Sequence, residues 1–120
     1  MKTHTHYRDA EAFITKDGST IRELMHPDRH AVCAQSVAEA IVAAGATTEL
    51  HLHRNSEEIY HITQGMGRMR LGTAMLNVSA GDTIVIEPGT PHCITNSGND
   101  ELKILCACSP AYSHDDTDLL

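Results

Sequence analysis

Short runs in which apolar and polar residues alternate fill the second half of the sequence. Alternation with a period of two places the apolar side chains on one face of a β-strand. Glycine and proline recur at short intervals from residue 45 to residue 98, so helices of ten or more residues do not fit between them. Turn signals at this spacing predict an all-β sandwich or barrel. The expected strands are residues 50–53, 59–63, 68–71, 83–86 and 102–106.

The first half of the chain is less regular. Residues 31–44 are rich in alanine and suit a helix by propensity, but a strand with small side chains is the alternative that we favour, because the rest of the chain reads as β. Residues 20–25 predict a leading strand. The acidic stretch 114–118 predicts a solvated end. We expect one domain, with a barrel core at about 20–110, a polar segment at 1–19 and an acidic tail at 111–120.

Composition narrows the range of partners. The chain has 120 residues and a formal net charge of -7, so it lacks the basic surface that nucleic-acid binding requires. No apolar stretch approaches 18 residues, which argues against a membrane span, and the first residues lack the apolar segment of a signal peptide. A cytoplasmic protein is therefore expected. Its four cysteines should be free thiols: Cys33, Cys93, Cys106 and Cys108. Cys106 and Cys108 form a C-x-C pair that could bind a metal, but buried, inert thiols are favoured there.

Nine histidines among 120 residues are the unusual feature of the composition. His51 and His53 are two residues apart in an alternating run, so both imidazoles lie on one face of a strand. Glu58 opens the next run, and a tight connection would return it beside the histidines. His92 follows a turn that contains proline and glycine. Histidines and a carboxylate on one side of a metal ion leave positions open for water, dioxygen or substrate.

Two spaced motifs carry a family resemblance. Residues 45–65 read as G, five residues, H-x-H, four residues, E, six residues, G, and residues 81–96 end in G-x-x-H-x-x-x-N. Together they resemble the two motifs of the cupin superfamily, here a small single-domain cupin of unassigned function. The resemblance implies a jelly-roll barrel, or double-stranded β-helix, of antiparallel strands with little or no helix. Glu87 stands where the family has proline, with Pro88 displaced by one residue, and we expect Glu87 to be exposed.

The resemblance also implies the metal ligands. They are His51, His53, Glu58 and His92, and they would hold one divalent transition metal per chain, which could be zinc, iron, manganese, nickel or copper. Glu57 competes for the carboxylate position, but the spacing to Gly65 favours Glu58. The alternative is that these histidines are ordinary barrel residues.

Strand parity assigns the neighbouring side chains. Tyr60 shares the inward face with Glu58, where it is either a catalytic hydroxyl or a core residue, and His61 should face outward. One of two pairs must face inward on the run 68–71. We favour Met69 and Leu71, although inward arginines at 68 and 70 could clamp a carboxylate or phosphate. Asn96 is expected to tie a strand end by hydrogen bonds.

Three functions are compatible with these residues. The first is a metal-dependent enzyme acting on a small organic molecule, as a dioxygenase, isomerase or epimerase, cyclase or decarboxylase, with Glu58 and Tyr60 as candidate catalytic residues. The second is a non-catalytic module that binds or senses a small molecule through a metal anchor, and the third is a structural barrel without metal. No second carboxylate is placed by the sequence to complete an acid–base pair. A homodimer is expected, because the sheets of an open barrel have edges to cover.

Overall fold

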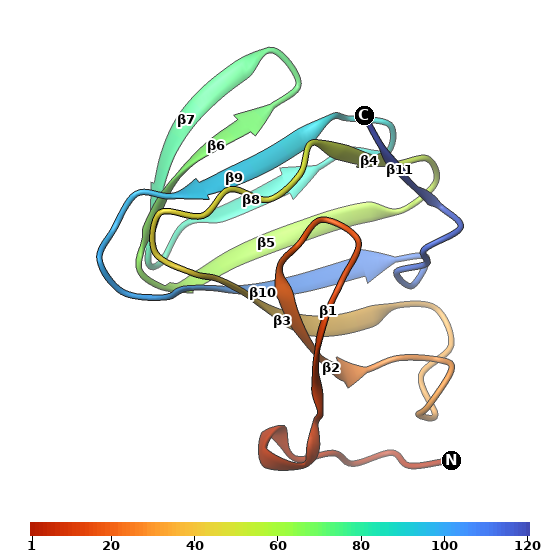
Figure 1. The fold of residues 1–120 in the computed structure, drawn as a ribbon. Helices are drawn as coiled ribbons and strands as arrows, with labels where there is room; N and C mark the ends of the chain where they lie inside the picture. The colour runs from red at the N-terminus through yellow and green to blue at the C-terminus, as the bar shows by residue number, and fades with distance from the viewer.

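The computed structural model describes residues 1–120 as two antiparallel sheets that face each other (Figure 1). A single turn of 3-10 helix, η1 (Tyr7–Asp9), is the one helical element, and the structure has no helix of the length and apolarity needed to cross a bilayer. The strands are β1 (Ala12–Ile14), β2 (Thr20–Met25), β3 (Ser36–Val42), β4 (His51–His53), β5 (Glu57–Gln64), β6 (Met66–Leu71), β7 (Ala74–Ser79), β8 (Thr83–Ile86), β9 (His92–Asn96), β10 (Leu102–Ser109) and β11 (Thr117–Leu119).

The strand order is that of a jelly roll. One sheet has six strands in the order β1-β2-β3-β10-β5-β8, and the other has five in the order β11-β4-β9-β6-β7. The all-β prediction is therefore confirmed. The predicted strands 20–25 and 83–86 have the same bounds as β2 and β8, and the alanine-rich stretch contains β3, so the preference for a strand there was right.

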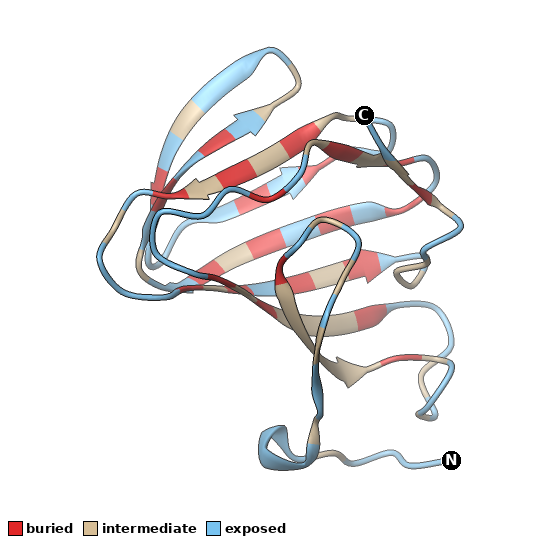
Figure 2. Ribbon diagram, viewed as in Figure 1, coloured by how far each residue is buried: buried red, intermediate tan, exposed pale blue.

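The core fills the space between the two sheets. Burial alternates along the strands, as the stripes of Figure 2 show, because successive side chains point to opposite faces. Ile62 and Ile104 point inward from the six-stranded sheet, and Met69 and Ile94 meet them from the five-stranded sheet. The inner faces therefore hold the fully buried large apolar side chains, whereas others, among them Ile59 and Val85, stay exposed on the outer face.

The strand-parity predictions are confirmed for the residues beside the core. Tyr60 is buried, and His61 faces outward, where its ring contacts the Thr83 hydroxyl. Arg68 and Arg70 are both exposed, and their guanidinium groups bond to outer-face oxygens. An inward arginine clamp is therefore absent from the barrel. Asn96 ties its strand end as expected, donating to the carbonyls of residues 42 and 100 and accepting from the Gly98 amide.

The C-terminal segment corrects the sequence interpretation. Its acidic residues predicted a solvated end, but β11 pairs with β4 and forms the edge of the five-stranded sheet. The Asp116 carboxylate accepts hydrogen bonds from the backbone amides of Asn55 and Ser56 and from the Asn55 side chain. Thr117, which follows it, is buried. These bonds hold the segment against the loop that joins β4 to β5.

The β1–β2 hairpin places its loop over the space between the sheets (Figure 1). Gly18 has a φ of +92°, which permits the tight turn, and the Thr15 and Ser19 backbones close it with a hydrogen bond of 3.0 Å. The Glu49 amide donates to the Asp17 carbonyl at 2.8 Å. Lys16 donates to two carbonyl oxygens of the C-terminal segment. The loop is therefore fastened to the segment that leads into β4 and to the C-terminal segment that pairs with β4.

Candidate metal centre

The four implied ligands converge between the two sheets. His51 and His53 come from β4 and His92 from β9 of one sheet, and Glu58 comes from β5 of the other. All four side chains are buried. One ligand nitrogen from each histidine lies within 4.8 Å of the other two. Glu58 Oε1 is 3.1 Å from His53 Nε2 and 3.6 Å from His92 Nε2.

Local backbone geometry explains how these residues meet. His51 is the register partner of His92, so neighbouring strands bring the two rings to a centroid distance of 4.2 Å. The turn before His92 has Pro88 followed by Gly89 with a φ of +77°, the signature of a type II turn. The Gly89 amide donates to the His53 carbonyl at 2.7 Å. The displaced proline therefore leaves the turn intact, and Glu87 is exposed as predicted.

The hydrogen bonds of His51 and His92 fix which ring nitrogen carries the proton. His51 Nδ1 lies 2.8 Å from the Glu49 carbonyl oxygen, and His92 Nδ1 lies 2.9 Å from the Thr90 carbonyl oxygen. A carbonyl oxygen only accepts, so each Nδ1 must donate. In the neutral ring, Nε2 then carries a lone pair, which is the form that binds a metal.

His53 reaches the same state through a hydroxyl relay. Its Nδ1 lies 2.8 Å from Thr117 Oγ1, and that hydroxyl donates to the Ser113 carbonyl at 2.8 Å. Because the threonine has one hydroxyl hydrogen, its oxygen must accept from His53 Nδ1. All three neutral imidazoles therefore present Nε2 as a lone pair. The sequence does not predict this pair of hydrogen bonds, because no pattern near residue 117 indicates a contact with residue 53.

The donor set fits a divalent transition metal. His92 Nε2 is buried and has no hydrogen-bond partner, which is costly for a polar atom. Three nitrogen lone pairs and a carboxylate oxygen that face one another repel unless a cation or a proton lies among them. Imidazole nitrogen with one carboxylate suits manganese, iron, nickel, copper and zinc alike, so the residues define the type of ion and not its identity.

Electrostatics keeps these groups ready to bind. Burial raises the pKa of Glu58, but where a proton on the Nε2 atoms of His53 and His92 takes the place of an ion, hydrogen bonds and positive charge from these rings outweigh burial and bring the pKa to about 2. Burial lowers the pKa of His51, and the nearby His92 lowers it further. At neutral pH Glu58 is therefore a carboxylate and His51 is a neutral ring, which are the states that coordinate a metal. Glu57, the rejected alternative to Glu58, is exposed.

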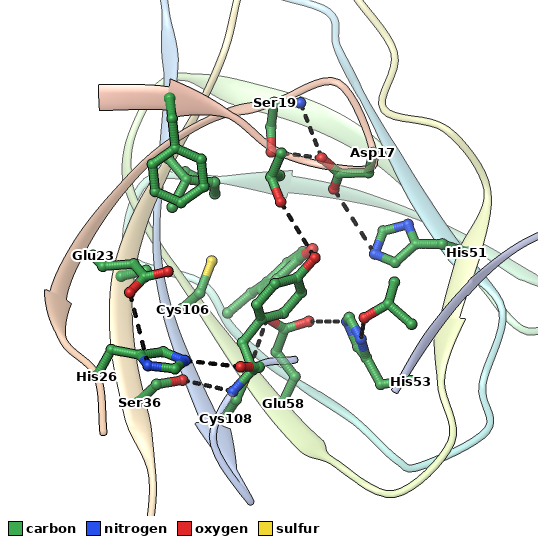
Figure 3. A pocket seen from close by; sticks show the side chains of 18 residues that line it. Asp17, Ser19, Glu23, His26, Ser36, His51, His53, Glu58, Cys106 and Cys108 are labelled. Atoms are coloured by element: carbon green, nitrogen blue, oxygen red, sulfur yellow. Dashed lines mark hydrogen bonds and ion pairs between the residues drawn. The ribbon is translucent and has the colours of Figure 1, made fainter. Parts of the chain in front are cut away.

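A cavity of about 50 Å³ opens beside the candidate ligands (Figure 3). His51, His53 and Glu58 contribute to its wall, whereas the fully buried His92 lies behind them. Tyr60 also lines it, and burial raises the pKa of this phenol well above its ordinary value, so the hydroxyl stays protonated. One water molecule needs about 10 to 15 Å³ of such space, so the cavity has room for only a few groups of that size.

Cys108 contacts the second oxygen of the candidate carboxylate ligand. Its thiol lies 3.2 Å from Glu58 Oε2 and donates to it. Burial and the charge of Glu58 raise the pKa of this thiol, so it remains protonated and keeps its hydrogen for the carboxylate. Cys106 and Cys108 are buried as expected, and all four cysteines are free. The contact between Cys108 and Glu58 was missed in the sequence.

A second carboxylate faces the site from the β1–β2 hairpin. Asp17 Oδ2 lies 3.8 Å from His51 Nε2, and Asp17 Oδ1 accepts from both the amide and the hydroxyl of Ser19 (Figure 3). In the sequence, residues 17–19 indicate a turn and nothing more. Their approach to the histidines depends on how the hairpin folds over the barrel, which no local pattern encodes.

Comparison with known proteins decides the family. The sequence model described as Cupin domain matches residues 38–108, which include all four candidate ligands. The protein is a cupin. A relative from Methanocaldococcus jannaschii, the uncharacterized protein MJ1618, is 53% identical over 116 residues, which are 97% of this chain and 93% of that protein.

Two further likenesses concern proteins with a named ligand or reaction. The oxalate-binding protein of Thermotoga maritima is 32% identical over 72 residues, which are 60% of this cupin and 60% of that protein. The formate complex of Lactobacillus farciminis oxalate decarboxylase superposes with a TM-score of 0.82 at 25% identity, over 96% of this cupin and 35% of that chain.

A third likeness shows the fold alone. A variant of Streptomyces Pac13 with uridine superposes with a TM-score of 0.81 at 16% identity, over 100% of this cupin and 92% of that chain. Pac13 is described as a nucleoside dehydratase. Barrels of one architecture thus host different reactions.

Proposed function

We propose that this cupin binds one divalent transition metal through His51, His53, Glu58 and His92 and acts as a metal-dependent enzyme on a small organic molecule. The observation that carries the proposal is the convergence of three Nε2 lone pairs and a buried carboxylate beside a cavity. A metal at this position would supply Lewis-acid or redox chemistry to a ligand in the cavity. The likeness to oxalate decarboxylase supports an enzymatic role.

The chain's own residues would divide the remaining work. Thr117 and the carbonyls of residues 49 and 90 hold the three rings in the ligating tautomer. Cys108 orients Glu58 by donating to its second oxygen. Tyr60 offers a protonated hydroxyl to a ligand in the cavity, and the surrounding core limits the entry of water.

The alternative function is a binding module that holds its ligand without turnover. The likeness to an oxalate-binding protein favours this alternative, since that protein is named for binding and not for a reaction. Both functions require the same metal centre. Incubation of the metal-loaded protein with candidate substrates, in the presence and absence of dioxygen, separates them, because only the enzyme releases an altered product.

Metal content tests the proposal directly. We expect about one equivalent of a transition metal per chain by inductively coupled plasma mass spectrometry on protein without a histidine tag. His92→Ala and the double variant His51→Ala/His53→Ala should lose it. His61→Ala is the matched control, since His61 is on the outer face of the same barrel and should keep the full equivalent. Wild-type protein without metal after reconstitution would contradict the proposal.

We also propose that the protein is a homodimer that covers the outer face of the six-stranded sheet. Val85, Ile59 and Ala107 are register partners across β8, β5 and β10, and Val85 and Ile59 are exposed to 52% and 40%. Light scattering should give twice the 13.1 kDa chain mass for the wild type. Ile59→Lys should be monomeric, whereas Met75→Lys, exposed on β7 of the other sheet, should stay dimeric. A monomeric wild type would show that the dimer proposal is wrong.

A further inference from the structure

We propose that the metal centre takes a neutral, hydroxyl-bearing chelator in preference to a dicarboxylate such as oxalate, and that Asp17 is the residue that makes this selection. The inference rests on the proposed function, because it names the class of ligand for the same metal.

The cavity wall is acidic and carries no basic side chain to balance it. Its lining residues include the carboxylates Asp17, Glu23 and Glu58, and they include no lysine or arginine. With a divalent metal bound, the three carboxylates and the ion together would carry one net negative charge. An oxalate dianion would add two more in a partly enclosed space, where unpaired charge is costly. A neutral ligand adds none.

The buried His26 does not supply the missing positive charge. Its Nδ1 accepts a hydrogen bond from the Asp28 amide at 3.1 Å, so that nitrogen carries no proton. Its Nε2 lies 2.8 Å from the Tyr112 carbonyl oxygen, which only accepts, so Nε2 is the donor. This pattern of one donor and one acceptor belongs to the neutral ring. Glu23 Oε2 lies 3.9 Å from His26 Nδ1, but the neutral ring does not balance the negative charge of this carboxylate.

The nearest basic side chains along the chain are engaged elsewhere. Lys16 precedes Asp17, but its Nζ donates to the carbonyls of residues 114 and 117 and does not line the cavity. Arg22 lies beside Glu39 at 4.0 Å and over the Tyr7 ring, also away from the cavity. An anionic ligand would therefore find the metal as its one cationic partner.

Asp17 is held in a position to accept a ligand hydrogen. Ser19 occupies Oδ1 with two hydrogen bonds, of 2.9 Å from its amide and 2.6 Å from its hydroxyl. Oδ2 makes no hydrogen bond and faces His51 Nε2 at 3.8 Å, while the Glu49 amide fixes the Asp17 backbone. The side chain is only 12% exposed. A hydroxyl on a metal-bound ligand can donate to Oδ2, whereas a carboxylate there would face a like charge.

Two chelators of similar size form the test. Acetohydroxamic acid enters as a neutral molecule and chelates through its carbonyl and N–O oxygens, and the hydroxyl proton that it releases passes to Asp17 Oδ2, so that no net charge is added to the cavity. Oxalate enters as a dianion, and both probes bind a metal through two oxygens. The protein is loaded with Co²⁺, and each probe is titrated while the visible absorption of the ion is followed. We expect the wild type to bind acetohydroxamic acid at least tenfold more tightly than oxalate. Cobalt content after desalting, measured on the same samples, separates binding from removal of the ion.

Asp17→Asn removes the charge and keeps the shape. We expect it to weaken acetohydroxamic acid by about tenfold, because the acceptor for the ligand's proton is lost, and to strengthen oxalate by about tenfold, because the negative potential at the cavity decreases. Glu57→Gln makes the same charge change at an exposed residue next to Glu58 and should leave both affinities unchanged. Ser19→Ala keeps the Asp17 charge but frees its carboxylate, so it should weaken acetohydroxamic acid while oxalate stays weak. This second variant keeps the test decisive if Asp17→Asn folds poorly.

The outcomes that overturn the inference differ from those that overturn the proposed function. A wild type that binds oxalate as tightly as acetohydroxamic acid, or an Asp17→Asn protein with the wild-type preference, refutes the role of Asp17 while leaving the metal centre in place. Failure to bind Co²⁺, or a cobalt spectrum that neither probe changes, refutes the metal-dependent function itself.

Discussion

At the scale of single residues, the site is defined by where protons are held. The Nδ1–H groups of His51 and His92 donate hydrogen bonds to carbonyl oxygens, and the Nδ1–H group of His53 donates to the Thr117 hydroxyl oxygen. A metal ion and a proton would therefore compete for the same three Nε2 atoms, and acid should favour the proton. The short contact of 3.1 Å between His53 Nε2 and Glu58 Oε1 is the place where a proton can substitute for the ion.

The metal-free protein should lose stability as the pH falls. The pKa of His51 is lower in the folded protein, so the unfolded chain binds a proton more readily and stability declines below about pH 6.5. The pKa of Glu58 is about 2 against an ordinary value of 4.5, so its contribution is present above about pH 4.5 and declines toward pH 2. Urea midpoints measured with chelator at several pH values should decrease steadily. His51→Gln should flatten the upper part of the curve, and an unchanged midpoint in the wild type would contradict this account.

At the scale of elements, β4 is held in its sheet mainly by β11, a strand that the sequence does not predict. β4 has three residues, and β9 on one side shares a single register pair with it, His51 with His92. β11 on the other side pairs with all three of its residues. The segment before β11 is held by the Asp116 carboxylate, whose pKa burial raises but bonds from Ser56 and Asn55 lower to a greater extent.

Removing the Asp116 carboxylate should detach β11 and disturb the metal centre. Asp116→Ala leaves the Asn55 and Ser56 amides without their acceptor, and we expect a loss of about 1.5 to 3 kcal/mol in the free energy of unfolding. Because Thr117 then loses its position under His53, metal affinity should also fall. Asp118→Ala is the control, since its ion pair with Arg54 is about half exposed and should contribute less than about 1 kcal/mol. Equal effects of the two substitutions, measured by urea unfolding and metal titration, would contradict this role of Asp116.

The sequence predicts those parts of the fold that local patterns encode. Alternation placed Tyr60, Met69 and the ligands on inward faces, and the motif spacing selected Glu58 over Glu57, which the structure leaves exposed. The contacts that were missed join distant segments. His53 and Thr117 are 64 residues apart, and Asp17 reaches His51 only because its hairpin folds across the barrel. Side chains in short turns and tails carry no periodicity from which such pairings could be inferred.

At the scale of the whole molecule, a bound ion would join the two sheets. Three candidate ligands come from the five-stranded sheet, and Glu58 comes from the six-stranded sheet. Separation of the sheets on unfolding would then break the coordination sphere, so metal binding and global stability should be coupled.

Chelation should therefore lower the melting temperature. At free metal about 1,000-fold above the dissociation constant, binding stabilises the folded state by about 4 kcal/mol, which for a chain of this size corresponds to roughly 10 to 20 °C. Calorimetry with and without chelator measures this shift. The double variant His51→Ala/His53→Ala should melt at one temperature in both conditions. A wild type that is insensitive to chelator would instead favour a structural barrel without metal.

The fastening of the hairpin and of β11 to β4 has a consequence for how the site forms during synthesis. The chain is made from its N-terminus, so Asp17 emerges first, the four candidate ligands follow, and Thr117 comes 25 residues after the last of them, His92. A nascent chain that has just passed His92 holds every ligand but lacks the strand that orients His53. If the proposed site binds its ion, tight metal capture would therefore await residue 117, and an ion retained by the protein would mark a chain translated to that point.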